Sequence, residues 1–102
     1  MEKLYKQEFP RYPNLEPEIV ELLEKNKFTK DTSWHNDVCP SFTNEADTLV
    51  LYIDFPNQED REFSSKRFSM NRLVDGEMVS DTPVFFVDTI EELAEQFKIA
   101  SY

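Results

Sequence analysis

The sequence predicts an α+β fold in which a four-stranded antiparallel meander sheet carries an N-terminal and a C-terminal helix packed on one face. Apolar residues recur at helical spacing near both ends of the chain, and segments of alternating apolar residues lie between them. The links between successive strand segments are short, and short links favour antiparallel neighbours. The chain of 102 residues has the size of one domain, so we expect a single domain over residues 1–102.

The N-terminal region is expected to form an extended arm followed by a helix. Pro10 and Pro13 oppose a helix over residues 1–14, so this arm should pack its aromatic residues on the domain or on another subunit. A frayed terminus is the alternative. The helix begins at Pro17, which suits a first helical turn, and ends near Asn26. Its buried face consists of Leu15, Ile19, Leu22 and Leu23.

The first two strands are predicted from alternating side chains. One strand is expected over residues 33–38, stopped by Pro40. The segment TLVLYIDFP, residues 48–56, carries the strongest strand signal in the chain. Its side chains divide between two faces, with Leu49, Leu51, Ile53 and Phe55 on one and Val50, Tyr52 and Asp54 on the other.

Two further strands and a helix complete the expected fold. A third strand covers residues 66–74, and the Asp-Gly pair at residues 75–76 favours a tight hairpin turn. The fourth strand returns over residues 78–87, where Pro83 should bulge it or place it at an edge. The last helix then begins with a capping box made by Thr89 and Glu92 and buries Ile90, Leu93, Ala94 and Phe97.

The composition argues against several classes of partner. The formal net charge of −10 repels phosphate backbones and anionic membrane surfaces, so we expect neither a nucleic-acid nor a membrane partner. The basic residues Arg61, Lys66, Arg67 and Arg72 are interpreted as solvated surface residues. The N-terminus has no apolar run typical of a signal peptide, and a single Cys forms no internal disulfide. Both features favour a cytoplasmic location.

The stretch SWHNDVCPSF, residues 33–42, holds the only Trp, His and Cys of the chain. On a strand, His35, Asp37 and Cys39 would share one face with about 7 Å between successive side chains. This spacing opposes both a shared metal ion and a His–Cys catalytic pair. We therefore expect no metal, no cofactor and no catalytic residue, with Cys39 a small buried hydrophobe and Trp34 in the core.

The same stretch is also the best candidate for contacting a ligand. Its polar side chains would offer hydrogen-bond donors and acceptors next to an aromatic ring. The candidate ligand-binding residues are Trp34, His35, Asn36, Asp37 and Tyr52.

The second face of the predicted sheet carries more apolar side chains than two short helices can cover. These side chains are Val50, Tyr52, Phe63 and one of Phe85 or Phe86. In one arrangement the N-terminal arm folds over this face. In the other, the face forms a homodimer interface or a binding cleft.

The order of segments also resembles a group of known proteins. The helix before DTSWHNDVCPSF, the strands LVLYIDFPNQEDRE, KRFSMNRL and VFFVDT, and the helix IEELAEQF are similar to small uncharacterised bacterial single-domain proteins, including those found in mobile gene cassettes. The resemblance covers nearly the whole chain. It implies a cytoplasmic bacterial accessory protein and carries no activity or assigned site.

Three hypotheses about function follow from these observations. The first is a protein-interaction module that acts as a homodimer or adaptor, favoured by the surplus of aromatic residues and the missing catalytic set. The second is a small-ligand-binding protein or enzyme with a pocket near residues 34–37. The third is a nucleic-acid-mimicking inhibitor, in which rows of Asp and Glu imitate phosphates for a basic partner.

Overall fold

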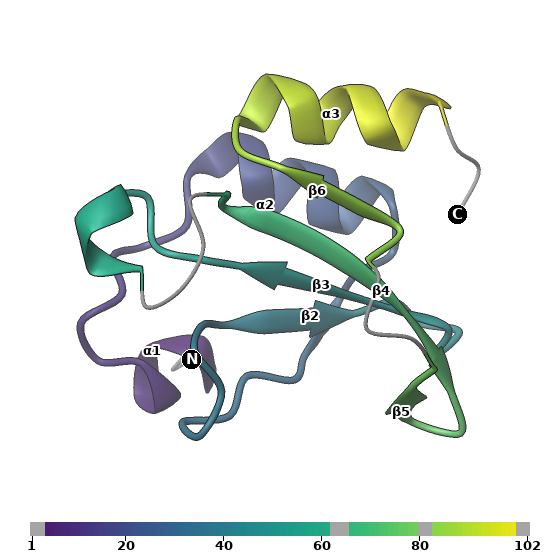
Figure 1. The fold of residues 1–102 in the computed structure, drawn as a ribbon, viewed down its shortest axis with the longest axis horizontal. Helices are drawn as coiled ribbons and strands as arrows, with labels where there is room; N and C mark the ends of the chain where they lie inside the picture. Colours follow the sequence, from purple (N-terminus) through teal and green to yellow (C-terminus); the bar gives the residue numbers. More distant parts are fainter. Residues whose placement is uncertain (1–3, 62–65, 80–82, 100–102) are drawn as a thin grey trace.

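An open antiparallel sheet lies at the centre of the α+β fold, with helices beside it (Figure 1). The computed structural model describes residues 4–61, 66–79 and 83–99. Within these residues the strands are β1 (Lys30–Asp31), β2 (Ser41–Thr43), β3 (Leu49–Ile53), β4 (Phe68–Val74), β5 (Glu77–Met78) and β6 (Phe85–Val87). Six strands in the described part of the chain therefore replace the expected four.

Two changes explain the difference in number: the expected fourth strand is divided, and β1 is a short strand that was not expected. The sheet has the order β1-β2-β3-β4-β5, and β6 also pairs with β4. The expected fourth strand over residues 78–87 is divided, because β5 pairs with the end of β4 and β6 pairs with its start. Pro83, which cannot donate a hydrogen bond to a neighbouring strand, lies between these two short strands.

Residues 33–38 do not form the expected strand, and this prediction is wrong. The amide of Asp37 donates a hydrogen bond to the carbonyl oxygen of Trp34 at 2.9 Å, which closes a turn. Nearby, the amide of Ser41 donates to the hydroxyl oxygen of Ser33 at 3.1 Å. Local side-chain hydrogen bonds of this kind offer the backbone an alternative to strand pairing. The strand begins only at Ser41, after the turn.

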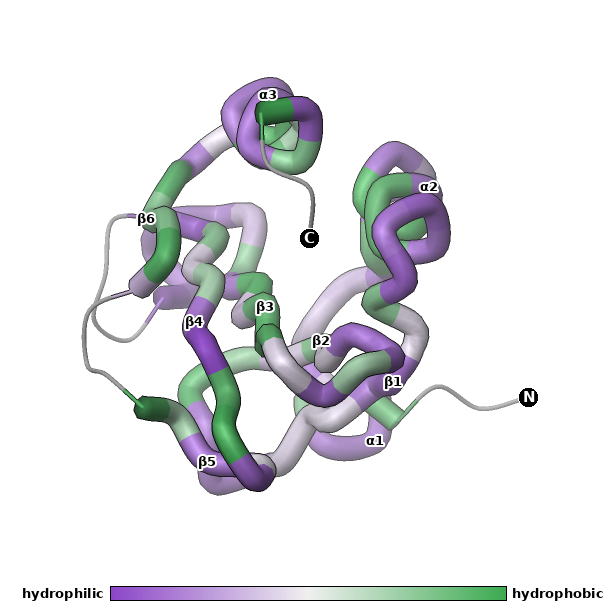
Figure 2. The backbone as a smooth tube through the Cα atoms, turned by 90° about the vertical axis from the view of Figure 1, so that its right-hand side faces the viewer, coloured by the Kyte–Doolittle hydropathy of each residue, from purple (hydrophilic) through white to green (hydrophobic). Residues whose placement is uncertain are grey.

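Two helices, α2 (Pro17–Lys25) and α3 (Ile90–Ile99), lie on the same side of the sheet (Figures 1 and 2). The predicted capping box of α3 is confirmed. The Glu92 amide donates to Thr89 Oγ1 at 3.0 Å, and Glu92 Oε1 accepts from the Thr89 amide at 3.0 Å. A single-turn 3-10 helix, η1 (Gln58–Asp60), lies between β3 and β4.

The N-terminal segment contains a short helix, α1 (Leu4–Glu8), where an extended arm was expected. The helix ends shortly before Pro10, so the prolines limit its length without preventing it. Tyr5 and Tyr12 are both buried, with ring centroids 5.9 Å apart in an edge-to-face arrangement. The Tyr5 amide also donates to Asp31 Oδ2 at 2.8 Å, which ties α1 to β1.

The main core lies between the sheet and the two longer helices. The sheet contributes Leu49, Leu51, Ile53, Phe68, Met70 and Phe85, and the helices and their flanks contribute Ile19, Leu23, Phe28, Leu93 and Phe97. The Phe97 ring centroid lies 5.6 Å from that of Phe28 and 6.4 Å from that of Phe85. Val50 and Tyr52 are outside this cluster, so the predicted alternation along β3 is confirmed.

A buried polar network joins the N-terminal region to β4. Arg67 binds both carboxylate oxygens of Glu16, at 2.6 and 2.9 Å, and donates to Tyr12 Oη at 3.1 Å. Its Nε donates to the carbonyl oxygen of Asp54 at 3.0 Å. The side chains of Arg67 and Arg61 are each only 5% exposed, so their interpretation as solvated surface residues is wrong. Glu16, the partner of Arg67, is 51 positions away in the chain, which hides the pairing from local sequence patterns.

Candidate binding groove

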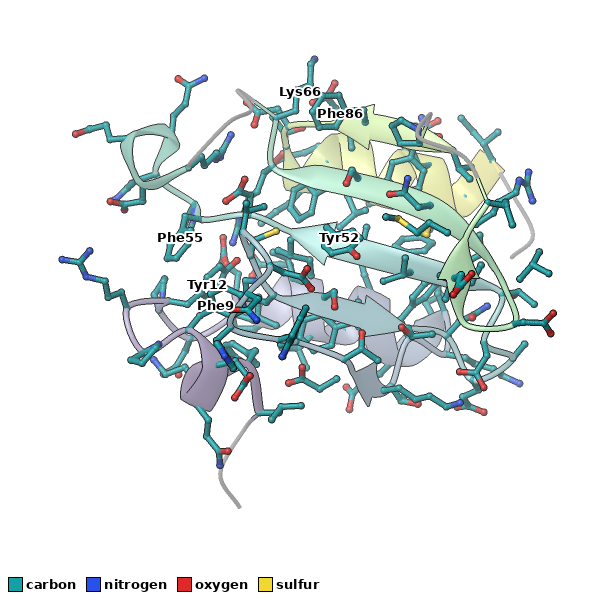
Figure 3. The ribbon with its side chains drawn as sticks, turned by 60° about the horizontal axis from the view of Figure 1, so that its bottom comes forward. Phe9, Tyr12, Tyr52, Phe55, Lys66 and Phe86 are labelled. Carbon is teal, nitrogen blue, oxygen red and sulfur yellow. The ribbon has the colours of Figure 1, made fainter. Side chains whose placement is uncertain are left out.

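The face of the sheet opposite α2 and α3 presents rows of side chains from neighbouring strands. Pairing places Ser41 beside Tyr52, Tyr52 beside Ser69, and Ser69 beside Phe86. Since every second residue of a strand points to the same face, these four side chains form one row across β2, β3, β4 and β6. Figure 3 shows this face, with Tyr52 in its middle, Phe86 at one edge, and α2 and α3 behind the sheet.

A second row on the same face contains Thr43, Val50 and Asn71. The Thr32 hydroxyl links the two rows at their β2 end, because it lies 2.9 Å from Ser41 Oγ and 3.0 Å from Thr43 Oγ1. The floor of the face therefore combines an aromatic ring and an aliphatic side chain with several hydroxyl groups. Such a mixture suits a contact that has both apolar and hydrogen-bonding parts.

The β4–β5 hairpin and the turn over residues 34–39 flank this floor. The hairpin turn uses Asp75 and Gly76 at φ values of 54° and 82°, which matches the Asp-Gly hairpin predicted from the sequence. Between the two walls lies an open groove of about 980 Å³, joined to a second hollow of about 390 Å³. Asp37, Tyr52 and Met78 line both parts, so we treat them as one surface, the open-face groove.

The larger part of the open-face groove carries negative charge. Its acidic lining residues are Asp37, Asp47, Asp75 and Glu77, and no Lys or Arg lines this part among the described residues. Asp47 already pairs with Lys30 at 2.7 Å. Partial burial raises the pKa of Asp37. Burial, with a smaller effect from the Asp37 charge, also raises the pKa of Tyr52, which keeps the phenol protonated as a hydrogen-bond donor.

The structure places the five candidate ligand-binding residues in two groups. Asn36, Asp37 and Tyr52 line the open-face groove. Trp34 and His35 are absent from its lining. His35 instead pairs with α1, because its ring Nδ1 lies 3.0 Å from Glu8 Oε1, and its amide donates to the same oxygen.

Trp34 is 52% exposed, which overturns the expectation that it lies in the core. The reason is the turn over residues 34–39, which replaces the strand that would have pointed the indole inward. Phe85 belongs to the core and Phe86 to the open face, and Phe63 lies outside the described residues.

The sequence interpretation missed several groove residues, namely Thr32, Ser41, Thr43, Asn71 and Met78. The alternation that places Tyr52 on this face also fixes the facing positions on β2 and β4 once their register is known. The sequence carried a signal for the position of Met78, since it follows the Asp-Gly turn and pairs with Leu73. Ser41 and Thr43 were hidden because β2 was expected earlier in the chain.

Cys39 is a small buried residue, as predicted, and is 3% exposed. Burial raises the pKa of its thiol, and the nearby Asp54 and Asp37 charges add to this effect. The thiolate is therefore scarce at neutral pH. No group of three or more His, Cys, Asp or Glu side chains within the described ranges could hold a metal ion.

A disulfide-exchange reagent such as DTNB should react slowly with the folded protein. We expect the native thiol to react roughly a hundredfold or more slowly than free cysteine, because reaction requires local opening of the structure. Since Cys39 is the only Cys, the absorbance change reports this site alone. The unfolded protein in guanidinium chloride is the control and should react fully. A native rate close to that of free cysteine would contradict the buried position.

Comparison with known proteins adds no family. No family model matches the chain, and no curated protein or solved structure does so either. Among the described helices, none combines the length and apolar character needed to cross a bilayer. The fold and the groove thus define an α+β protein with one sheet face packed by helices and one open, acidic face.

Proposed function

We propose that this protein is an interaction module that binds another protein chain through the open-face groove, as an adaptor or as a homodimer. The observation that carries the proposal is the gathering of exposed apolar side chains at this face. Eight large hydrophobic residues are exposed in the described part of the chain. Four of them, Val38, Val74, Met78 and Phe86, line the groove or its adjoining hollow.

A cluster of exposed apolar side chains is unfavourable on a surface that stays in water, because these side chains lose the hydrophobic stabilisation of burial. Exposed apolar patches promote association, so they are typical of interaction sites. Phe86 is 44% exposed and stands next to Phe85, which is 7% exposed in the core. The short strand β6 thus places one aromatic residue in the core and one on the open face. Aromatic residues are enriched at protein interfaces, so Phe86 supports an interface at the open face.

A small-ligand-binding protein is the second candidate. Asp37, Asn36 and Tyr52 converge on the groove from separate elements, and these three residue types offer both donors and acceptors. The groove is open, however, whereas small-molecule sites usually enclose most of their ligand. This geometry favours a protein chain as the occupant.

Site-specific photo-crosslinking tests the proposal. p-Benzoylphenylalanine in place of Phe86 should give a discrete adduct when the full chain is irradiated in the cells that carry its gene. The matched control places the same group at Ile99, which is 70% exposed on α3 and away from the groove. An adduct of twice the chain mass indicates a homodimer, and another discrete mass indicates an adaptor.

The position of the cross-link decides the outcome. A discrete adduct from position 86 with none from position 99 supports the open face as the interface. Adducts of equal yield from both positions, or none from position 86, would refute it.

A further inference from the structure

We propose that the occupant of the open-face groove is a basic segment of a different protein, with Lys or Arg side chains flanking an apolar residue. This inference rests on the proposed function and names the chemistry of the partner. Asp37 stands on one wall and Asp75 and Glu77 stand on the other, and none of the three has an ion pair among the described residues.

The basic side chains near the face do not neutralise these three carboxylates. Lys30 is paired with Asp47, and Arg67 is committed to Glu16. Lys66 lines only the smaller hollow. The larger part therefore keeps a negative potential that adds to the overall charge of −10. A concave surface of one sign concentrates ligands of the opposite sign.

The floor between the charged walls suits the rest of such a segment. Tyr52 offers a ring face, on which a guanidinium or ammonium group stacks favourably. Met78, which is 51% exposed, offers apolar contact beside it, and the hydroxyl group of the exposed Thr32 offers a hydrogen-bond acceptor. An extended chain with alternating basic and apolar side chains matches both the walls and the floor.

The same charges disfavour a second copy of this chain. In a two-fold symmetric dimer the same patch contacts itself. The acidic side chains Asp37, Asp75 and Glu77 of one copy would then lie close to those of the other, and like charges placed together across an interface oppose binding. Nucleic acid is disfavoured for the same reason, because its phosphates are negative.

Fluorescence anisotropy with a labelled peptide tests the inference. The probe is a short peptide of alternating Lys and Val, compared with a Glu–Val peptide of equal length and a Lys–Ser peptide that lacks apolar side chains. The groove variant carries Asp75→Asn and Glu77→Gln. Both changes remove charge with little change in shape, and Asn tolerates the positive φ of residue 75.

The matched control carries Glu91→Gln and Glu95→Gln, which remove the same two charges from exposed positions on α3. We expect the Lys–Val peptide to bind wild type and control with equal affinity and the groove variant about five- to tenfold more weakly, as for two exposed ion pairs. The Glu–Val peptide should not bind, and the Lys–Ser peptide should bind more weakly than Lys–Val.

Equal weakening in both double variants would overturn the inference, since it would show attraction to net charge alone. Equal binding of the Lys–Val and Lys–Ser peptides would show that the groove does not recognise an apolar side chain in the partner, and would overturn that part of the inference. Failure here is separable from failure of the proposed function. A discrete adduct at position 86 together with equal peptide binding by both variants would contradict a basic partner. The same result would still support a protein interface at the open face. An adduct of twice the chain mass would identify a second copy and also overturn the inference.

Discussion

Replacing Phe85 with Ala should lower the free energy of unfolding by about 3–5 kcal/mol, because the change leaves a large cavity in the core. The same replacement at the next residue, Phe86, should lower it by no more than about 1 kcal/mol. The two residues occupy one strand, β6, but point to opposite faces of the sheet. Phe85 contacts the Phe97 ring at a centroid distance of 6.4 Å, whereas Phe86 is 44% exposed.

Urea unfolding followed by fluorescence or circular dichroism measures both values. Each variant is the control for the other, since they share residue type, strand and substitution. The slopes of the two transitions should agree with that of the wild type, which shows that the same surface is exposed on unfolding. Similar losses of stability at both positions would mean that the open face also contributes to folding, and would contradict the division into a core face and a binding face.

Replacing Arg67 with Ala should cost about 2–3 kcal/mol of stability. The change removes two charge-assisted bonds to Glu16 and the hydrogen bonds to the Asp54 carbonyl oxygen and Tyr12 Oη. It also removes the packing of the guanidinium over the Phe68 ring, 5.1 Å from its centroid. This value lies at or below the bottom of the range for a broken buried ion pair, since water can reach the one-third-exposed Glu16 carboxylate.

The pH dependence of stability separates the ion pair from simple packing. The bonds from Arg67 hold the pKa of Glu16 below its usual value of 4.5. A lowered folded-state pKa contributes stability above pH 4.5, and this part is lost as the pH falls through the folded-state value. The stability difference between wild type and Arg67→Ala should therefore shrink below that pH. Arg72→Ala, at an exposed position of β4, is the control and should cost little at any pH. A constant difference across the acid range would contradict the role given to Glu16.

The parts of the fold that were predictable from the sequence depend on neighbouring residues. The Asp-Gly turn, the Thr89–Glu92 capping box and the alternation along β3 are each written within a few positions. The first strand was misplaced because Ser33 and Asp37 satisfy local hydrogen bonds that a periodicity rule does not count.

The parts that were not predictable depend on distant partners. Arg67 has the sequence pattern of a surface residue, and its burial follows from Glu16 and Tyr12, which precede it by more than fifty positions. The groove was predictable in one respect, because alternation assigned Tyr52 to the second face. Its walls required the register of β2 and the bend of the β4–β5 hairpin, which side-chain patterns alone do not specify.

The most direct test of the central claim, that the open face binds a protein partner, is nuclear magnetic resonance of isotope-labelled methionine methyl groups. Of the three methionines in the chain, Met70 is fully buried in the core, Met78 is 51% exposed at the groove and Met1 lies outside the described residues. When the partner captured at position 86 is added to the full chain, the Met78 resonance should shift or broaden while that of Met70 stays in place. A complex that leaves Met78 unchanged would contradict the claim.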